Sequence, residues 1–163
     1  MSVEIAPIAI SHAESFHSCL DSVAREACFL AATKAPSLEK IEAFVSENVA
    51  NDAIQFVALD DARVVGWADV LSPWPDAIAH RGTLGMGIVS EYRRQRIGER
   101  LLRACIEKAL SKGITRIELE TRSDNHPSIK LYEKLGFVHE AVKRRAMRFD
   151  GEYYDSVQMS LLL

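Results

Sequence analysis

A run of arginines between an apolar segment and an amphipathic segment constrains the fold of this chain most. Five arginines and a single acid, Glu99, fall within residues 93–103. The run follows the glycine-containing apolar segment 84–89 and opens an amphipathic segment over 97–110. This order predicts a strand, a basic turn and a helix N-terminus. Unpaired backbone N–H groups and the helix dipole favour polyphosphate at such a junction, so we expect a nucleotide-type cofactor there.

The composition indicates one globular domain over residues 1–163. The chain is 48% apolar and 26% charged, with a formal net charge of −3. Because the basic charge is local and carries no interleaved aromatic residues, we expect no nucleic-acid partner. The apolar runs are far shorter than the ~20 residues that cross a bilayer, and the first residues show no signal-peptide pattern. We therefore expect a cytoplasmic protein with no membrane partner.

The cysteines and histidines predict neither disulfides nor a metal site. The three cysteines, Cys19, Cys28 and Cys105, are an odd number without ligand spacing, which indicates reduced side chains. The five histidines are scattered along the chain, and no two of them have convincing ligand spacing.

Apolar periodicity and turn residues predict four helices and seven strands. The strands are expected over 3–10, 54–59, 64–71, 80–89, 114–121, 137–149 and 153–163, and the helices over 11–31, 38–51, 97–112 and 125–135. The elements follow one another as β-α-α-β-β-β-α-β-α-β-β. That order predicts a mixed sheet with helices on its faces.

Two motifs in this order resemble the signatures of the GNAT superfamily of N-acetyltransferases. Arg93 to Gly98 is similar to the family pattern Arg/Gln-x-x-Gly-x-Gly/Ala, and Asn125 with the segment Ser128 to Phe137 is similar to a second signature. The resemblance covers essentially the whole chain. It implies an α/β (α+β) fold with a mixed, mostly antiparallel sheet of six to seven strands and helices on both faces. It also implies direct transfer of an acetyl group from acetyl-CoA to a primary amine in a ternary complex.

The resemblance assigns cofactor-binding roles to two segments and one asparagine. Met86, Gly87 and Ile88 would lie beside the pantetheine arm like an added strand, with a backbone N–H near Ile88 polarising the thioester carbonyl. Asn125 would contact the same arm, although asparagine is also a good helix N-cap. The pyrophosphate would be held by the loop residues Arg93, Arg94, Gln95, Arg96, Ile97, Gly98 and Glu99.

Arg96 departs from the family pattern, which has glycine at this position. An arginine can enter a helix if its φ angle stays negative, and its side chain can turn away or reach a phosphate. The sequence leaves open how Arg96 shapes this loop, while Gly98 and the helix N-terminus keep the site suited to a phosphate.

The same resemblance supplies two candidate catalytic residues. Tyr132 matches the position that donates a proton to the coenzyme A sulfur, and its ordinary pKa of about 10 is near that of an alkyl thiol. The alternative is a core tyrosine on its helix. Glu120 matches the general base of the ribosomal-protein alanine N-acetyltransferase branch; the alternative is a solvated carboxylate at a strand end. Glu26 and Glu91 are weaker substitutes for this base.

The acceptor is the least constrained part of the prediction. We favour a small-molecule amine, such as an amino acid, a polyamine or an amine-bearing toxin or antibiotic, because the chain is compact. The alternatives are a peptide amine (a protein N-terminus or lysine), a non-catalytic acyl-CoA sensor, and an acidic macromolecule on 91–103. Trp67 is expected in the core, whereas Trp74 and Tyr92 could line an acceptor pocket. The resemblance further predicts a homodimer, which is common in the family.

Overall fold

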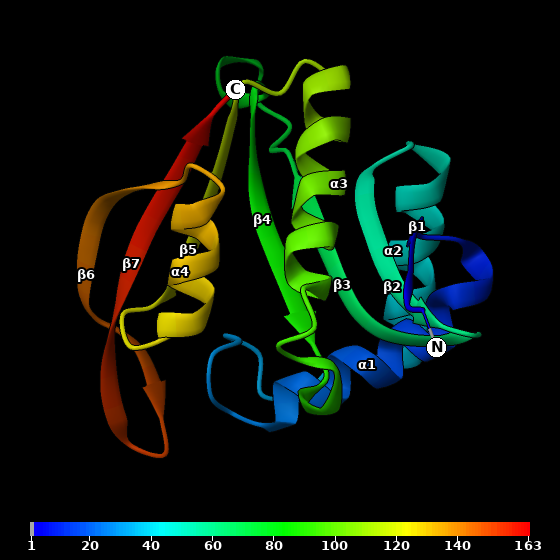
Figure 1. Cartoon of the computed structure of the whole chain (residues 1–163), viewed down its shortest axis with the longest axis horizontal. Helices are drawn as coiled ribbons and strands as arrows, with labels where there is room; N and C mark the ends of the chain where they lie inside the picture. The colour runs from blue at the N-terminus through cyan, green and yellow to red at the C-terminus, as the bar shows by residue number, and fades with distance from the viewer. Residues whose placement is uncertain (1) are drawn as a thin grey trace.

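The computed structural model describes residues 2–163, and the chain forms a seven-stranded sheet in the order β1-β2-β3-β4-β5-β7-β6 (Figure 1). The strands are β1 (Glu4–Pro7), β2 (Ile54–Asp60), β3 (Arg63–Leu71), β4 (Arg81–Ile88), β5 (Arg116–Arg122), β6 (Val138–Phe149) and β7 (Glu152–Leu162). The helices are α1 (Ala13–Arg25), α2 (Leu38–Ala50), α3 (Ile97–Ser111) and α4 (His126–Lys134). Short 3-10 turns η1, η2 and η3 cover Ile10–His12, Asp76–Ile78 and Ser90–Tyr92.

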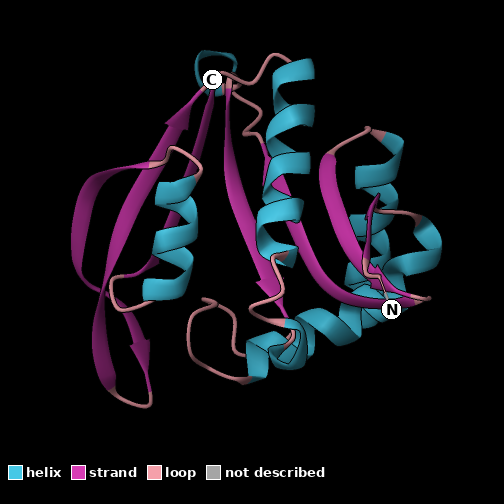
Figure 2. Cartoon of the chain, in the orientation of Figure 1, coloured by secondary structure: helices cyan, strands magenta, loops and turns pink. Residues whose placement is uncertain are grey.

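The helices form layers on both faces of the sheet, as the sequence predicts. Figure 1 shows α3 and α4 over the near face, with α1 and α2 behind the sheet, and Figure 2 shows the same layers by element type. On the α1 side, the rings of Phe16 and Trp67 meet edge to face at 5.8 Å between centroids. On the other side, α3 buries Leu101, Leu102 and Cys105 completely. The sheet is therefore the middle layer of the core.

The predicted helix 11–31 and strand 3–10 are both too long. The first helix ends at Arg25, and Ala27 has a left-handed φ of 48°, so 26–37 is a connecting loop rather than helix. The first strand ends at Pro7, because the 3-10 turn Ile10–His12 starts soon after it. The apolar spacing continues past both ends, and a local change of backbone conformation leaves no mark in that spacing.

The pairing of β4 with β5 is short, and it is the one parallel pair within residues 2–163. Only Arg81–Thr83 pairs with Arg116–Glu118, whereas β4 stays paired with β3 as far as Ile88. Beyond Glu118, β5 continues along β7 to Arg122. The edge of β4 over residues 84–88 therefore has no strand partner in the described chain.

The two outer edges of the sheet are irregular. The edge strand β1 has four residues and ends in Pro7. The other edge strand, β6, shifts its register against β7 between Lys143 and Met147, and Arg145 lies in this stretch with a left-handed φ of 51°. The basic segment 143–148 thus lies within the interrupted part of β6.

No helix within residues 2–163 is long and apolar enough to cross a membrane.

Gly87 is required by the Trp67 side chain on the neighbouring strand. A Cβ atom at residue 87 would lie 2.4 Å from the Trp67 ring, which covers this part of β4. Gly87 is opposite Trp67 in the β3–β4 pair, and Trp67 is buried.

We expect Gly87→Ala to lower the free energy of unfolding by about 1–3 kcal/mol, the usual cost of overpacking. Urea unfolding would measure this change. Thr83→Ala, at an exposed position of the same strand, is the matched control and should change stability little. Equal stability of Gly87→Ala and Thr83→Ala would contradict the close packing of Trp67 on β4.

Candidate active site

The unpaired edge of β4 leads directly into the basic loop. Strand β4 ends at Ile88, the 3-10 turn 90–92 follows, and α3 begins at Ile97. A Cβ atom at Gly98 would lie 3.3 Å from the side-chain ends of both Met86 and Ile88, so glycine lets α3 start close against β4. The open edge and the N-terminus of α3 are thereby held side by side.

The loop offers an array of free backbone donors. The N–H groups of residues 94–99 have no hydrogen-bond acceptor within residues 2–163, whereas the N–H of Arg100 donates to the carbonyl oxygen of Arg96. Arg94 and Arg96 both have a left-handed φ of 61°. Left-handed residues alternating with other backbone conformations can turn successive N–H groups toward one side, as in the nests that bind anions. The helix dipole of α3 adds to the attraction.

Arg96 does not have a negative φ. Arg96 is the N-cap residue of α3, with φ 61° and ψ 12°. The chain must turn sharply to enter α3, and the turn uses the left-handed region in which glycine is comfortable. Arginine takes this conformation despite its Cβ atom.

The charged side chains of the loop divide into paired and free groups. Arg93 donates from Nε to the carbonyl oxygen of Ile88 at 2.8 Å and pairs with Glu26 at 2.6 Å. Glu99 is held by Lys134 and Arg103, which lower the pKa of its carboxyl. Arg94 and Arg96 are exposed, without a side-chain partner in the described chain. The loop therefore presents free positive charge, and its one acid is already neutralised.

Asn125 is the N-cap residue of α4, and Tyr132 lies within this helix. Asn125 is buried at the N-cap position, but its side chain makes no capping bond and donates to Thr121 Oγ1 at 3.0 Å. Tyr132 is also buried, against Phe137, and burial raises the pKa of its phenol to about 12. The phenol therefore stays protonated near neutral pH and is able to donate a proton.

Glu120 lies on β5, and its carboxylate is hydrogen-bonded to neighbouring side chains. Its carboxylate accepts from Lys143 Nζ at 2.7 Å and from Ser156 Oγ at 2.6 Å. Both contacts lower its pKa, with Lys143 the larger cause. A lower pKa makes the carboxylate a weaker base. The two weaker candidates are paired as well, because Glu26 accepts from Arg93 and Glu91 accepts from Arg63.

A feature absent from the sequence predictions is the cation stack at Arg122. The guanidinium lies 3.5 Å from the ring centroid of Tyr154, pairs with Asp124 at 2.6 Å and donates to the carbonyl oxygen of Cys28 at 2.7 Å. Phe29 lies over the same group. Arg122 thus ties the loop after α1 to β5 and to the β6–β7 hairpin.

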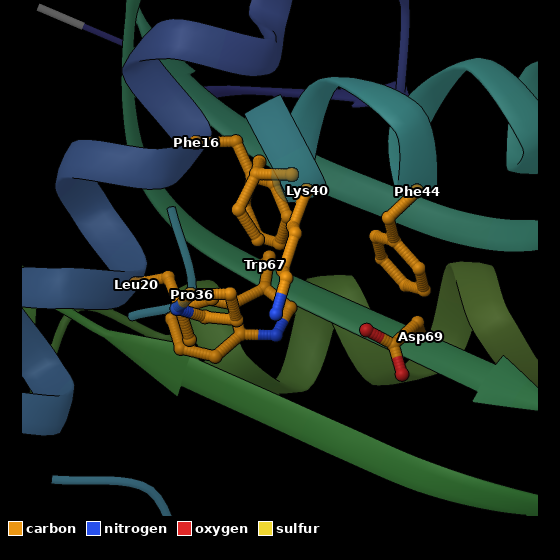
Figure 3. A pocket seen from close by; sticks show the side chains of 8 residues that line it. Phe16, Leu20, Pro36, Lys40, Phe44, Trp67 and Asp69 are labelled. Carbon is orange, nitrogen blue, oxygen red and sulfur yellow. The ribbon is translucent and has the colours of Figure 1, made fainter. Parts of the chain in front are cut away.

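A cavity of about 330 Å³ lies between α1, α2 and β3 (Figure 3). Trp67 is buried, as predicted, and also lines this cavity; Trp74 is exposed on its loop, and the Tyr92 hydroxyl donates to Asp60. Asp69 lines the cavity too, and burial raises the pKa of its carboxyl to about 7. Asp69 is not among the residues predicted from the sequence, although it is the single acid in the apolar segment 64–71.

Comparison with known proteins decides the family. The model of the acetyltransferase (GNAT) family matches residues 21–137. The chain belongs to this family. The GNAT fold, the mixed seven-stranded sheet and the assignment as a GNAT-type acyltransferase are thereby confirmed.

Individual GNAT relatives match parts of the chain. N-alpha-acetyltransferase 30 of Schizosaccharomyces pombe is 37% identical over 83 residues, which are 50% of this chain and 55% of that protein. The L-amino acid N-acetyltransferase of Escherichia coli is 31% identical over 107 residues, 65% of this chain and 66% of that protein. The chain thus spans between half and two thirds of these relatives.

A solved GNAT structure matches the whole chain in fold. The phosphinothricin acetyltransferase of Sinorhizobium meliloti, crystallised with acetyl-CoA, superposes with a TM-score of 0.91. The match covers 100% of this chain and 89% of that one at 19% identity.

The left-handed backbone at Arg96 leads to a stability prediction. Arg96→Gly and Arg96→Ala remove the same charge, but only glycine relieves the cost of about 1–2 kcal/mol for a left-handed residue. Glycine returns about 0.5–1 kcal/mol through the greater freedom of the unfolded chain. We expect Arg96→Gly to be the more stable variant by about 0.5–1 kcal/mol in urea unfolding. Greater stability of Arg96→Ala would contradict a left-handed turn at this position.

The buried carboxyl of Asp69 predicts a pH dependence of stability. Its pKa is about 7 in the folded chain and about 3.9 in the unfolded chain. The unfolded state therefore loses its proton first as pH rises, and folding stability falls from about pH 4 until pH passes 7.

Asp69→Asn removes this contribution. We expect the difference in unfolding free energy between Asp69→Asn and the unmodified chain to grow in favour of the variant from pH 4 to pH 8, in urea titrations. Because the two proteins share all other titratable groups, the contributions of those groups cancel in this difference. A pH-independent difference would show that Asp69 does not titrate in this range.

Proposed function

We propose that this GNAT domain transfers the acetyl group of acetyl-CoA to the primary amine of a small molecule. The observation that carries the proposal is the free N–H array of residues 94–99 at the end of a β4 edge that lacks a strand partner. The array suits a pyrophosphate, and the edge suits an extended amide-bearing chain. Coenzyme A joins these two chemical groups in one molecule.

The residues present fit this cofactor. Arg94 to Glu99 would hold the pyrophosphate through backbone N–H groups, with the side chains of Arg94 and Arg96 adding positive charge. Met86, Gly87 and Ile88 would hold the pantetheine arm along the β4 edge. Arg93 would act indirectly, since its side chain already joins Ile88 to Glu26. Asn125, bonded to Thr121, would present its remaining polar atoms to the same arm.

The chain's own groups then manage protons. Acetyl-CoA supplies the acetyl thioester. The attacking amine must be neutral, so its ammonium form first gives up a proton; Glu120, through water, is the base that the family resemblance suggests. Tyr132, whose phenol is buried and protonated, would donate to the departing sulfur. Formation of the C–N bond and cleavage of the C–S bond complete the transfer.

The relatives support an amine acceptor and suggest two kinds. One relative is named for L-amino acids and a fold neighbour for phosphinothricin, and these names favour a small molecule. Another is named an N-alpha-acetyltransferase, which favours an α-amine and leaves a protein N-terminus as the second candidate. The cytoplasmic location and the homodimer stay predictions from the sequence and the family resemblance.

Tyr132→Phe tests the mechanism. We expect a fall in kcat of about 100-fold or more, the usual range for a lost proton donor, with unchanged affinity for acetyl-CoA. Thiol release would be measured with a panel of amino acids, polyamines and peptides. Tyr153→Phe, at an exposed tyrosine, is the matched control.

The outcomes separate the rival functions. Unchanged turnover of Tyr132→Phe would remove its role as proton donor. Saturating acetyl-CoA should raise the melting temperature, because it binds the native state only. A raised melting temperature with no thiol release from any amine would favour a sensor, and no shift at all would overturn the proposed cofactor.

A further inference from the structure

The cavity between α1, α2 and β3 contains two opposite charges that do not pair with each other. Its walls are apolar, formed mainly by Phe16, Leu20, Phe44 and Trp67. Lys40 enters it from α2 and Asp69 from β3, as Figure 3 shows. Neither head group has a hydrogen-bond or ion-pair partner within residues 2–163. An apolar cavity with one separated cation and anion complements a zwitterion with an apolar body.

Asp69 is the stronger of the two signals. Asp69 is buried, with 9% of the residue exposed, and it lines the cavity. A carboxylate removed from water without a partner costs several kcal/mol, so buried acids are normally paired. A cationic ligand would supply the missing partner. Lys40 is exposed at the cavity rim, where an anionic group of the same ligand could reach it.

We propose that this cavity is the acceptor site and that it binds a free α-amino acid with an apolar side chain. The α-ammonium group pairs with Asp69, the carboxylate pairs with Lys40, and the side chain packs against the aromatic walls. The inference rests on the proposed acetyl transfer and specifies its substrate class. The cavity volume of about 330 Å³ lies in the range of small-molecule pockets.

The strand register brings this amine to the reacting group. Asp69 is opposite Gly85 in the β3–β4 pair, and a Cβ atom at Gly85 would lie 3.1 Å from Asp69 Oδ1. The carboxylate therefore leans over β4, since glycine leaves the space open. Residue 85 belongs to the stretch of β4 with the free edge, and one strand is only about 5 Å wide. An amine on Asp69 is thus placed beside a thioester lying along that edge.

Asp69 also suits the proton transfer that the reaction needs, and in this inference it replaces Glu120 as the base. Its carboxylate accepts one proton from the bound ammonium, and the neutral nitrogen attacks the acetyl carbonyl carbon. A C–N bond forms and the C–S bond breaks. The nitrogen releases a second proton, and the sulfur leaves as a thiol after taking one proton, so the atoms and charges balance. In the ligand-free chain, burial raises the pKa of Asp69 to about 7, whereas Lys143 and Ser156 lower the pKa of Glu120, so Asp69 is the stronger base of the two.

The test compares acceptors that differ by one charged group. Phenylalanine, phenethylamine (the same amine without the carboxylate) and a peptide amide beginning with phenylalanine would be assayed for kcat/KM with acetyl-CoA. We expect phenylalanine to exceed the other two at least 10-fold. Lys40→Met should abolish this ratio, whereas Lys34→Met, an exposed lysine in the preceding loop, should retain it. Asp69→Asn should lower kcat/KM for all three at least 100-fold, with Asp76→Asn as its control.

Several results would overturn the inference. These are phenethylamine or the peptide equalling phenylalanine, an unchanged ratio in Lys40→Met, and full activity in Asp69→Asn. Calorimetric titration of phenylalanine into the folded chain and its variants tests the cavity without turnover; absence of binding also overturns the inference. Thiol release from polyamines or peptides alone would overturn only the inference. No thiol release from any amine would instead overturn the proposed acetyl transfer.

Discussion

The early separation of β4 from β5 is the constraint on which the site depends. Three residues of parallel pairing hold the two strands together, and beyond Thr83 each strand follows a different neighbour. The crossover between them contains α3, so the N-terminus of α3 and the free edge of β4 end up together. Arg93 then fastens the intervening loop to the end of β4 through the Ile88 carbonyl. A longer β4–β5 ladder would fill the edge and leave the loop donors without an adjacent chain to bind.

Charged groups near this opening differ by whether the fold already uses them. Glu99, Glu120 and Arg122 have close partners, and their charges stabilise local structure. Arg94, Arg96 and Asp69 have none in the described chain. An ion pair at the surface contributes little to stability, whereas an unpaired charge in the core costs much free energy. Asp69, which is buried without a partner in the described chain, is therefore the most informative of these groups. Arg94, Arg96 and Asp69 are therefore the charged groups near this opening that are available to a ligand.

The fold could be predicted well because its signals are local. Apolar periodicity located all seven strands and four helices, and the motif at Arg93 to Gly98 located the loop. The errors arise where three-dimensional context decides. The spacing of apolar residues could not show that Ala27 turns left-handed, and the sequence alone could not show that the entry to α3 requires a positive φ at Arg96. The significance of Asp69 depends on its register with Gly85, which only the paired strands reveal.

The two irregular outer strands have a consequence for where this sheet is able to grow. Short length, proline, bulges and clustered lysine or arginine all discourage the addition of a foreign strand. β1 is short and contains Pro7, and β6 is interrupted within the basic segment 143–148. Both perimeters therefore resist edge-to-edge aggregation. The free edge of β4 over residues 84–88 is then the position at which an extended ligand could pair with the sheet. The outer edges that resist self-association and the inner edge that is open to a ligand are thus different parts of one sheet.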